Sequence, residues 1–452
     1  MPFNRVLIAN RGEVAVRVIR ALHELGSEAV AVYSTADEGA LHTRLADRAV
    51  CIGPAPAAES YLKIPSVIAA ATTTRSEAVH PGWGFLAENT AFAEACAESD
   101  LIFVGPTAET MTRMGNKAAA KQEMDAAGVP VVPGTLAETT LDEARAAADE
   151  DGYPVLLKAV AGGGGKGMRL VREPDELEAA FQTASAEAQA AFGEPGLYIE
   201  KAIVPARHVE IQVLADGEGG VLTLGERECS IQRRHQKLIE ESPSPALDDE
   251  TRAAMEDAAE RAARAVEYRN AGTFEFILGA DGAFYFIELN SRLQVEHPVS
   301  ELVTGIDIVR EQLRIATGDK LRTTGRAERR GHAIEIRINA EDPARDFLPV
   351  PGRVERFRAP LGPGVRVDTH LEDGALVPPN YDSLLAKVIV WDSSRPAAID
   401  RALRALSELE VVGVPTTAAA ARDILRTEEF ATGRYSTGFL EDAGSRLPAL
   451  AG

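Results

Sequence analysis

The stretch Thr273–Asn290, TFEFILGADGAFYFIELN, reads as two apolar strands joined by a short turn. The pair Asp281-Gly282 is typical of the two-residue turn of a β-hairpin. With the turn centred on that pair, Glu275 lies directly opposite Glu288 on the neighbouring strand. Apolar residues flank both glutamates, so the sequence predicts two carboxylates side by side on a largely apolar hairpin.

Two carboxylates in this arrangement repel each other, because directly opposed Cβ atoms lie roughly 4.5–5.5 Å apart. A divalent cation between them removes the repulsion, and Mg²⁺ prefers such oxygen ligands together with substrate phosphates. Asn290 lies two residues beyond Glu288, on the same face of the strand, where its amide oxygen can join the site. The hairpin therefore predicts a metal site at Glu275, Glu288 and Asn290. The alternative is one exposed glutamate on each strand, with a bulge that shifts the register.

Length and composition limit the class of protein. The chain has 452 residues, which suggests two to four domains at roughly 100–200 residues each. The net charge of −21 argues against general binding to nucleic acid or to a membrane surface. No stretch approaches the roughly 20 apolar residues of a membrane span, and the start MPFNRVLIAN reads as a first strand and not as a signal peptide. The three cysteines form no closely spaced pair, so we expect a cytoplasmic protein without a disulfide framework or zinc site.

The first 112 residues alternate apolar runs with amphipathic segments. Strands are expected at Arg5–Asn10, Ala29–Tyr33 and Leu101–Val104, with a helix at Val14–Leu25 between the first two. This alternation predicts a parallel α/β sheet. The turn after the first strand lacks the Gly-x-Gly-x-x-Gly fingerprint, so we expect a nucleotide-type scaffold without a bound dinucleotide.

Helical and strand patterns continue along the rest of the chain. We expect helices at 142–149, 175–191, from about 306 and at 396–409, and strands at 208–216 and 332–340. The segment from 331 to 446 is rich in proline and glycine, which implies short antiparallel strands and turns. The chain is therefore expected to combine α/β and α+β parts.

A glycine run stands between two lysines in Lys158–Met168, KAVAGGGGKGM. Lysine is scarce, with nine residues against thirty-nine arginines, yet six of the nine lie between Lys117 and Lys237. The run is not a Walker A loop, because Lys166 is followed by glycine and not by Ser or Thr. Glycine backbone can still lie against a ligand and direct N–H groups at phosphate oxygens, so we expect a phosphate contact or a loop that closes over a nucleotide. The alternative is a mobile surface turn.

The segment Ser291–Pro298, SRLQVEHP, follows the hairpin directly. Arg292 and Glu296 are four residues apart and would form an ordinary surface ion pair in a helix. Pro298 argues against helical geometry at His297, so a functional loop is expected. An arginine beside a metal site suits a small planar oxyanion, and a neighbouring glutamate suits a general base.

The segment Glu226–Lys237, ERECSIQRRHQK, mixes cationic, amide and acidic side chains. Composition alone suggests a solvated strand and turn. Cys229 has no base at short spacing that would mark it as a nucleophile, so we interpret it as structural.

Taken together, these segments resemble biotin carboxylase, an enzyme family of the ATP-grasp superfamily. The resemblance runs in order from about residue 3 to 445 and rests on the segments IANRGEVAVRVIRA, HPGWGFLAEN, GNKAAAK, KAVAGGGGKGM, RHVEIQVL, ERECSIQRRHQK, GTFEFIL, FIELNSRLQVEHP, HAIEIRINAEDP and PPNYDSLLAKV. It implies a Rossmann-like N-terminal domain (1–112), an ATP-grasp domain (113–330) with a glycine-rich lid (about 131–203), and a C-terminal α/β domain (331–452).

The resemblance also implies roles for individual residues. At the nucleotide it places Lys117 and Lys158 on phosphates, Glu200 and Lys201 at adenine, His208 and Gln232 near the ribose, His235 in the pocket, and Gly163, Gly164, Gly165 and Lys166 in the lid. Around bicarbonate it places Lys237, Arg292, Gln294, Val295 and Glu296. Glu275, Glu288 and Asn290 would hold Mg²⁺ or Mn²⁺, as the hairpin register indicates independently.

The implied reaction uses ATP and bicarbonate to carboxylate biotin. Glu296 would deprotonate bicarbonate, ATP would convert it to carboxyphosphate, and Arg337 would stabilise the biotin enolate oxygen. Lys166, Trp83 and Ser291 stand where the family often has Arg, Tyr and Thr, and none of these departures removes a catalytic group.

Partners follow from the same resemblance. No Ala-Met-Lys-Met biotinylation sequence occurs in the chain, so we expect a separate subunit that acts on a biotin carboxyl carrier protein, with carboxyltransferase subunits of an acetyl-CoA or other acyl-CoA carboxylase, as in fatty acid biosynthesis. A homodimer is expected, with Arg17 and Arg20 at positions associated with the interface, although they would equally suit a solvated helix face. Two alternatives remain: another carboxylate-activating ATP-grasp ligase, and a nucleotide-binding regulator without catalysis.

Overall fold

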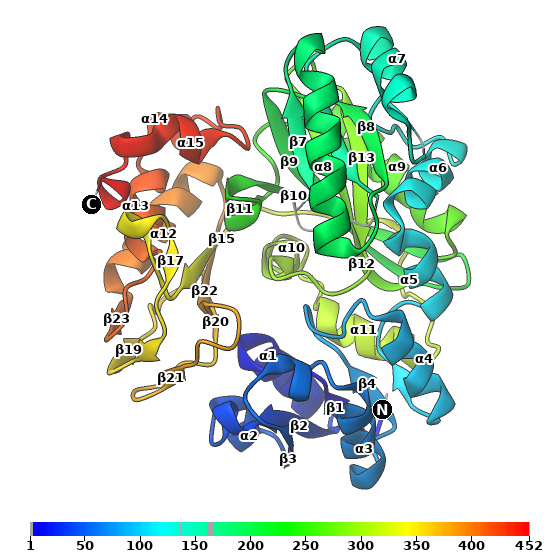
Figure 1. Cartoon of the computed structure of the whole chain (residues 1–452). Coiled ribbons are helices and arrows are strands. Elements are labelled where there is room, and N and C mark those ends of the chain that lie inside the picture. Colours follow the sequence, from blue (N-terminus) through cyan, green and yellow to red (C-terminus); the bar gives the residue numbers. More distant parts are fainter. Residues whose placement is uncertain (1–2, 136, 161–166, 452) are drawn as a thin grey trace.

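The computed structural model describes residues 3–135, 137–160 and 167–451. Three regions follow one another along the chain: an N-terminal α/β region, a central region of long strands, and a C-terminal region beside it (Figure 1). The short helix α10 (His297–Thr304) lies between them (Figure 1). Within the described ranges, no helix is long and apolar enough to cross a membrane.

The N-terminal region is the predicted parallel α/β sheet. Its strands run in the order β3-β2-β1-β4-β5, which matches the first five strands of the doubly wound order 3-2-1-4-5-6. They are β1 (Arg5–Ile8), β2 (Glu28–Ser34), β3 (Arg48–Gly53), β4 (Ala78–His80) and β5 (Ile102–Phe103). The helices of this region are α1 (Gly12–Glu24), α2 (Leu41–Leu45), α3 (Ile64–Thr74) and α4 (Thr90–Glu98). The central strands are apolar and buried on both faces, as a parallel sheet requires.

A second sheet joins the central and C-terminal regions. Its strands run in the order β13-β12-β9-β10-β11-β15-β22-β20, all antiparallel, with the short β14 beside β10. They are β9 (Ala206–Asp216), β10 (Val221–Arg233), β11 (Gln236–Ser242), β12 (Arg269–Gly279), β13 (Phe284–Asn290), β14 (Gly325–Arg326), β15 (His332–Asn339), β20 (Val365–Thr369) and β22 (Leu384–Asp392). The pairing of β11 with β15 carries the sheet across the expected domain boundary at residue 330.

Alternation along β12 places its side chains on two different faces. Phe274 and Phe276 pack into a buried cluster with Met255 and Ala259 of α9 (Asp249–Ala265). Because successive side chains of a strand point to opposite faces, Glu275 must point away from this cluster. The apolar neighbours thus fix the direction of the glutamate.

The hairpin register confirms the predicted pairing of Glu275 with Glu288. The predicted two-residue turn is wrong. The closing hydrogen bond runs from the Gly279 N–H to the Ala283 oxygen at 2.8 Å, so three residues form the loop. A bulge at Ile287 inserts one residue into β13 and restores the alignment of the two glutamates.

A small separate unit precedes the long strands. The strands β6 (Val155–Ala159), β7 (Met168–Val171) and β8 (Leu197–Lys201) form a sheet in the order β7-β6-β8. Helices α7 (Leu141–Asp151) and α8 (Leu177–Phe192) pack on it through a small apolar core. Both helices were predicted to within a few residues. The glycine run lies between β6 and β7, and Gly163, Gly164, Gly165 and Lys166 lie outside the described residues.

The remaining elements complete the central and C-terminal regions. The connecting helices are α5 (Ala108–Gly115), α6 (Lys117–Ala126) and α11 (Ile308–Ala316). The C-terminal helices are α12 (Arg395–Glu408), α13 (Ala418–Leu425), α14 (Glu428–Ala431) and α15 (Phe439–Ala443). Short paired strands lie at the Pro/Gly-rich turns, as predicted: β16 (Glu341–Asp342), β17 (Leu348–Pro349), β18 (Gly352–Arg353), β19 (Arg356–Arg358), β21 (Leu376–Val377) and β23 (Glu410–Val412).

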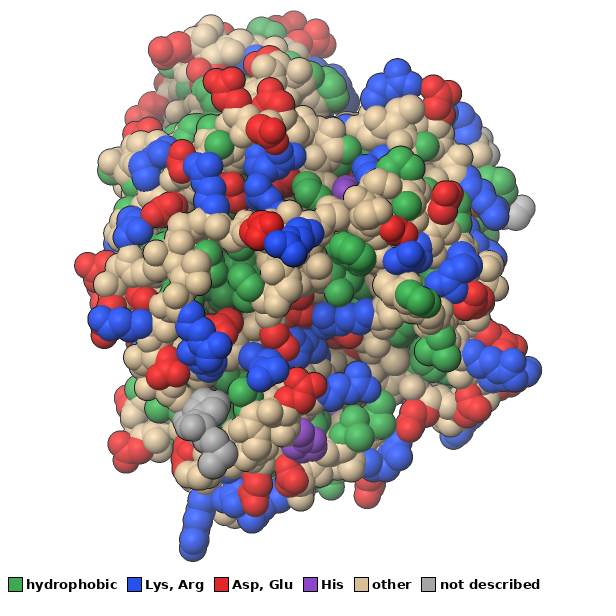
Figure 2. Space-filling model, turned by 180° about the vertical axis from the view of Figure 1, so that it is seen from behind, with side chains coloured by type: hydrophobic (Ala, Val, Ile, Leu, Met, Phe, Trp, Pro, Cys, Tyr) green, Lys and Arg blue, Asp and Glu red, His purple; other side chains and the backbone are tan. Residues whose placement is uncertain are grey.

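On the face drawn in Figure 2, acidic and basic side chains are interspersed. The net charge of −21 is therefore not gathered into one acidic patch on this face.

Candidate active site

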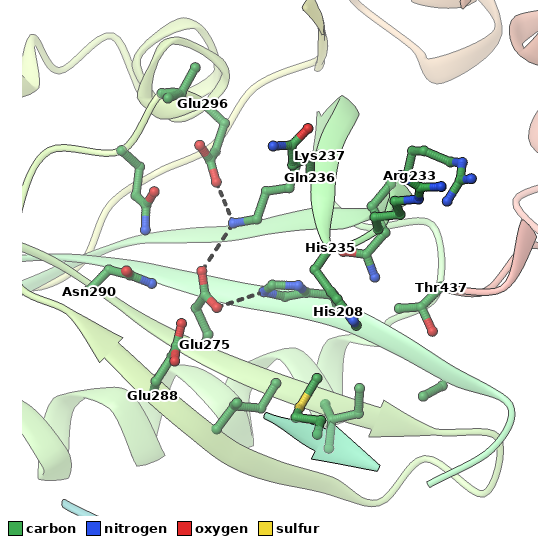
Figure 3. Close-up of a pocket in the computed structure, with 18 of the residues that line it drawn as sticks. His208, Arg233, His235, Gln236, Lys237, Glu275, Glu288, Asn290, Glu296 and Thr437 are labelled. Carbon is green, nitrogen blue, oxygen red and sulfur yellow. Dashed lines mark hydrogen bonds and ion pairs between the residues drawn. The ribbon is translucent and has the colours of Figure 1, made fainter. Parts of the chain in front are cut away.

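One cavity of about 660 Å³ contains every predicted site residue that the structure describes. Figure 3 shows part of it, with side chains from β9, β10, β11, β12 and β13 directed into one space. Its lining includes Trp83 from the N-terminal region, Arg337 from the C-terminal region, and the central-region residues Lys117, Lys158, Glu200, Lys201, His208, Gln232, His235, Lys237, Glu275, Glu288, Asn290, Arg292, Gln294, Val295 and Glu296.

Lys237 lies at the centre of a group of buried carboxylates (Figure 3). Its ammonium is 2.6 Å from Glu210, 3.1 Å from Glu275 and 2.5 Å from Glu296. Burial lowers the pKa of Lys237, but the surrounding acidic groups outweigh burial and raise that pKa well above its usual value. The lysine is therefore charged and neutralises part of a strongly acidic group.

Glu296 is fully buried between two cations. Besides Lys237, the guanidinium of Arg337 lies 2.9 Å from the Glu296 carboxylate. Burial raises the pKa of Glu296, but Lys237 and Arg337 outweigh it and hold the pKa well below its usual value. Arg337 also donates from Nε to Glu240 at 2.6 Å, and burial raises the pKa of Glu240 to about 7. One guanidinium thus orients two carboxylates.

The two hairpin glutamates face the same space from adjacent strands (Figure 3). The Glu275 carboxylate lies 3.1 Å from the ring Nε2 of His208, and the Glu288 carboxylate forms an ion pair with the Lys117 ammonium at 2.9 Å. Burial raises the pKa of Glu275, but the neighbouring Lys237 and His208 outweigh it and lower that pKa. Both carboxylates are thus paired with basic side chains from other elements: Lys237 of β11 and His208 of β9 for Glu275, and Lys117 of α6 for Glu288.

The hairpin of β10 and β11 carries two predicted nucleotide-site residues, Gln232 and His235, and the predicted bicarbonate-site residue Lys237. Gln232 pairs with Lys237 and Arg233 pairs with Gln236, and the two turn residues between the second pair, Arg234 and His235, have φ values of 49° and 65°. Positive φ at both positions is typical of a type I′ turn, which matches the twist of a hairpin. The turn thereby holds Gln232, His235 and Lys237 on one edge of the cavity.

Lysines also gather at the other end of the cavity. Lys158 forms an ion pair with Glu200, and Lys121 lies 3.2 Å from the same carboxylate. The ammonium of Lys201 donates to the backbone oxygens of Gly152 and Tyr153 at 2.8 and 3.2 Å, so its side chain is engaged by protein and not free for a ligand.

The segment that precedes α10 is a loop, as expected, and differs from the sequence expectation only at His297. Arg292 pairs with Glu88 of the N-terminal region at 2.8 Å, whereas Glu296 pairs with Lys237. Residues 291–296 are non-helical as predicted, but His297 begins α10. Pro298 is therefore in the first turn of that helix, where the missing N–H costs no hydrogen bond.

Several buried groups of the site were missed. Arg227 is fully buried and donates to Glu210 at 2.5 Å, to Gln212 at 2.6 Å and to Thr273 at 3.0 Å. The interpretation of 226–237 as a solvated strand is wrong, because β10 is buried as far as Ile231. The sequence signal for such a residue is a charged side chain at every second position of a strand, with apolar neighbours between. This pattern does not show whether the face that carries the charges is buried.

Two smaller expectations were also resolved. Cys229 is buried, and burial raises its pKa well above the usual thiol value, which agrees with a structural role. Arg17 is neither free nor solvated, because it pairs within the chain with Glu301 at 3.0 Å and Asp307 at 2.6 Å. Arg20 is exposed.

Comparisons with known proteins cover almost the whole chain. Family models match for "Biotin carboxylase, N-terminal domain" over residues 2–111, "Carbamoyl-phosphate synthase L chain, ATP binding domain" over 116–324 and "Biotin carboxylase C-terminal domain" over 335–442. A biotin carboxylase from Nostoc is 54% identical over 98% of this chain and 99% of its own length.

Solved structures agree with the family models. A biotin carboxylase complex with βγ-ATP from Campylobacter jejuni superposes with a TM-score of 0.94, at 46% identity over 97% of this chain and 99% of that one. The biotin carboxylase domain dimer of Hydrogenobacter thermophilus 2-oxoglutarate carboxylase, with MgADP, ADP and bicarbonate, has a TM-score of 0.93, at 46% identity over 98% of each chain.

Proposed function

The chain belongs to the biotin carboxylase family of ATP-dependent ligases, and from this premise we propose that it carboxylates carrier-bound biotin with bicarbonate through carboxyphosphate. The observation that carries the proposal is the meeting of Glu296, Lys237 and Arg337 in the same cavity as the paired hairpin glutamates. The two cations beside Glu296 can bind a small oxyanion, and the carboxylate between them can accept its proton.

Bicarbonate takes the place between these cations. Once it shares Lys237 and Arg337, Glu296 loses part of its cationic stabilisation, and the pKa of its carboxyl group rises toward that of a useful base. Glu296 then accepts the bicarbonate proton while a bicarbonate oxygen attacks the γ-phosphorus and ADP leaves. Arg292, Gln294 and Val295 complete the walls of this anion site.

The second step consumes carboxyphosphate. Its C–O bond to phosphate breaks to give CO₂ and phosphate, and the phosphate accepts the proton of the biotin ureido nitrogen. The resulting enolate attacks CO₂ through nitrogen. Arg337 places its guanidinium where it stabilises the enolate oxygen.

The nucleotide occupies the other end of the cavity. Lys117 and Lys158 bind its phosphates, and Glu200 and Lys201 lie near adenine, where Lys201 acts through its backbone because its ammonium is already engaged. His208, Gln232 and His235 contact the ribose side. We further propose that 131–203 closes over the nucleotide as a lid, with domains at 1–112, 113–330 and 331–452.

The hairpin side chains fit a magnesium ion. Two carboxylates and the Asn290 amide oxygen form a set of hard oxygen donors, and the Glu275 and Glu288 charges are at present balanced by Lys237 and Lys117. With ATP bound, Glu275, Glu288 and Asn290 would hold Mg²⁺, which would supply positive charge to offset the phosphate charge. A neighbouring group, His208, Glu210 and Glu275, also brings three potential ligand atoms within 4.8 Å, but its imidazole nitrogen is a poorer match for Mg²⁺.

The partners follow from the same proposal. The biotin substrate is held by a carrier protein, the protein acts as a homodimer, and a carboxyltransferase passes the carboxyl group to an acyl-CoA. Since one structural relative is a domain of a 2-oxoglutarate carboxylase, the acceptor class needs its own test. Reconstitution with carrier and transferase subunits should transfer label from bicarbonate to an acyl-CoA and not to a 2-oxo acid.

The experiment for the proposed reaction is ADP release with Mg-ATP, bicarbonate and free biotin, comparing wild type with Glu296→Ala. Biotin should stimulate release in the wild type, and the variant should lose that stimulation. Release without biotin dependence would favour another ATP-grasp ligase. ATP binding without bicarbonate-dependent release would favour a regulator.

A further inference from the structure

Lys387, on β22 of the C-terminal region, is a fully buried lysine with no role in the chemistry described above. Its ammonium donates to the backbone oxygen of Val295 at 2.7 Å and lies 3.3 Å from Glu13 on α1. One ammonium therefore joins the C-terminal sheet, the N-terminal helix and the segment before α10. Figure 1 shows α10 between these regions.

The Lys387 hydrogen bond reaches a segment that has no regular secondary structure. Residues 291–296 belong to no helix or strand. The backbone hydrogen bonds around the start of α10 are long, from His297 N–H to Gln294 oxygen at 3.4 Å and from Val299 N–H to Glu296 oxygen at 3.3 Å. Side chains from elsewhere must therefore fix its conformation. Arg292 is held by Glu88 at one end, and Val295 by Lys387 at the other.

The position of this hydrogen bond matters because a peptide group is planar and trans. Fixing the direction of the Val295 carbonyl also fixes the direction of the Glu296 N–H and the placement of the Glu296 Cα. Both residues line the cavity, and Glu296 holds the carboxylate that faces Lys237. Lys387 thus sets the orientation of the proposed base without touching it.

The ammonium remains charged in this buried place. Burial lowers the pKa of Lys387, but Glu13 and other carboxylates outweigh burial and raise it. Glu13 is itself held by the Trp83 Nε1–H at 3.0 Å, and Trp83 lines the cavity. A charged donor makes a stronger hydrogen bond than a neutral one, so the contact to Val295 is firm.

We propose that Lys387 is a positioning residue, which orients the bicarbonate-binding segment through the Val295 carbonyl and couples it to the N- and C-terminal regions. The proposal rests on the proposed function, because it takes residues 292–296 as the bicarbonate site. Loss of the Lys387 ammonium should raise the KM for bicarbonate and leave the KM for ATP nearly unchanged. The lysines assigned to the ATP phosphates lie on other elements, Lys117 at the start of α6 and Lys158 on β6.

The test compares the wild type with the double variant Lys387→Met/Glu13→Gln, in which the glutamine avoids a buried unpaired carboxylate. We expect the KM for bicarbonate to rise by about tenfold or more, because small misplacements at a reacting centre are costly, while the KM for ATP stays within about twofold. The matched control is Arg395→Met. It removes a half-buried cation that pairs with Glu241 at 2.6 Å, far along the chain from the segment. Its melting temperature should fall with both KM values unchanged.

The outcomes separate the two proposals. If wild type shows no bicarbonate-dependent ADP formation, the proposed function fails. If wild type is active and the double variant shows only a lower melting temperature or active fraction, with both KM values unchanged or raised in parallel, the positioning role is refuted. Should the double variant not fold, Lys387→Arg keeps the charge but displaces the donor. A selective rise in the bicarbonate KM then supports the proposal, and an unchanged value overturns it.

Discussion

Replacing Lys237 by methionine removes the single cation shared by three buried carboxylates. Its ammonium lies 2.6 Å from Glu210, 3.1 Å from Glu275 and 2.5 Å from Glu296. Removing one partner of a buried ion pair costs about 3–5 kcal/mol, because a charge is left uncompensated. Because Glu210 keeps Arg227 and Glu296 keeps Arg337, Lys237→Met should lie at the lower end of that range.

The assay is urea unfolding of the whole chain, measured alongside ADP release. Lys237→Met/Glu210→Gln removes one positive and one negative charge, so it should recover about half of the lost stability or more. It should not recover activity, because the cation that binds bicarbonate is still absent. In the wild type Arg227 donates to Glu210 at 2.5 Å, and the side-chain oxygen of a glutamine at this position can accept the same hydrogen bond.

Two results would contradict this reasoning. An unchanged unfolding midpoint for Lys237→Met would mean that the carboxylates do not depend on the ammonium. A double variant that regains bicarbonate-dependent ADP release would mean that Lys237 serves the structure alone.

Three further predictions concern Glu288, Arg337 and His42. Glu288→Gln should raise the Mg²⁺ concentration needed for half-maximal activity by at least about tenfold. Even the loss of a residue that only supports a metal ligand lowers metal affinity about 10- to 100-fold. An unchanged Mg²⁺ requirement would exclude Glu288 as a ligand. Arg337→Lys keeps the charge but loses the planar guanidinium that contacts both Glu240 and Glu296. Biotin-stimulated ADP release should therefore fall more than ADP release without biotin. An equal loss of both would contradict a role of Arg337 toward biotin. Burial lowers the pKa of His42 to about 4 in the folded protein, from its usual value of 6.5. The unfolded chain therefore takes up a proton that the folded protein does not, and stability is lost as the pH falls from 6.5 toward 4. Between pH 7 and 5, wild type should lose about 2 kcal/mol more than His42→Gln in urea unfolding, and parallel curves would refute the lowered pKa of His42.

Local sequence patterns predicted the elements well wherever one periodicity dominated. The parallel N-terminal sheet, α7, α8 and the long strands appear close to the expected residues, because buried apolar runs and amphipathic helices leave a strong signal. The pairing of Glu275 with Glu288 was also predicted, although the turn was not. A three-residue loop and a bulge at Ile287 compensate each other, and neither is visible in a pattern of period two.

The partners of the site residues could not be predicted, because they come from distant parts of the chain. Arg292 pairs with Glu88 some two hundred residues earlier, and Arg337 reaches both Glu240 and Glu296. The pairing of β11 with β15 joins the strands that carry Glu240 and Arg337, whereas Glu88 reaches Arg292 from the N-terminal region. Pro298 shows the limit of a local rule, since it disfavours a helix before it yet occupies the first turn of α10.

The most direct test of the account follows oxygen from bicarbonate into phosphate. Freshly dissolved ¹⁸O-labelled bicarbonate is supplied with Mg-ATP and biotin, and the released phosphate is examined by mass spectrometry. Because a bicarbonate oxygen attacks the γ-phosphorus, the account predicts one ¹⁸O in each phosphate released by the wild type, with formation of labelled phosphate lost in Glu296→Ala. Phosphate that carries only ATP and water oxygens would contradict carboxyphosphate formation and, with it, the proposed role of Glu296, Lys237 and Arg337.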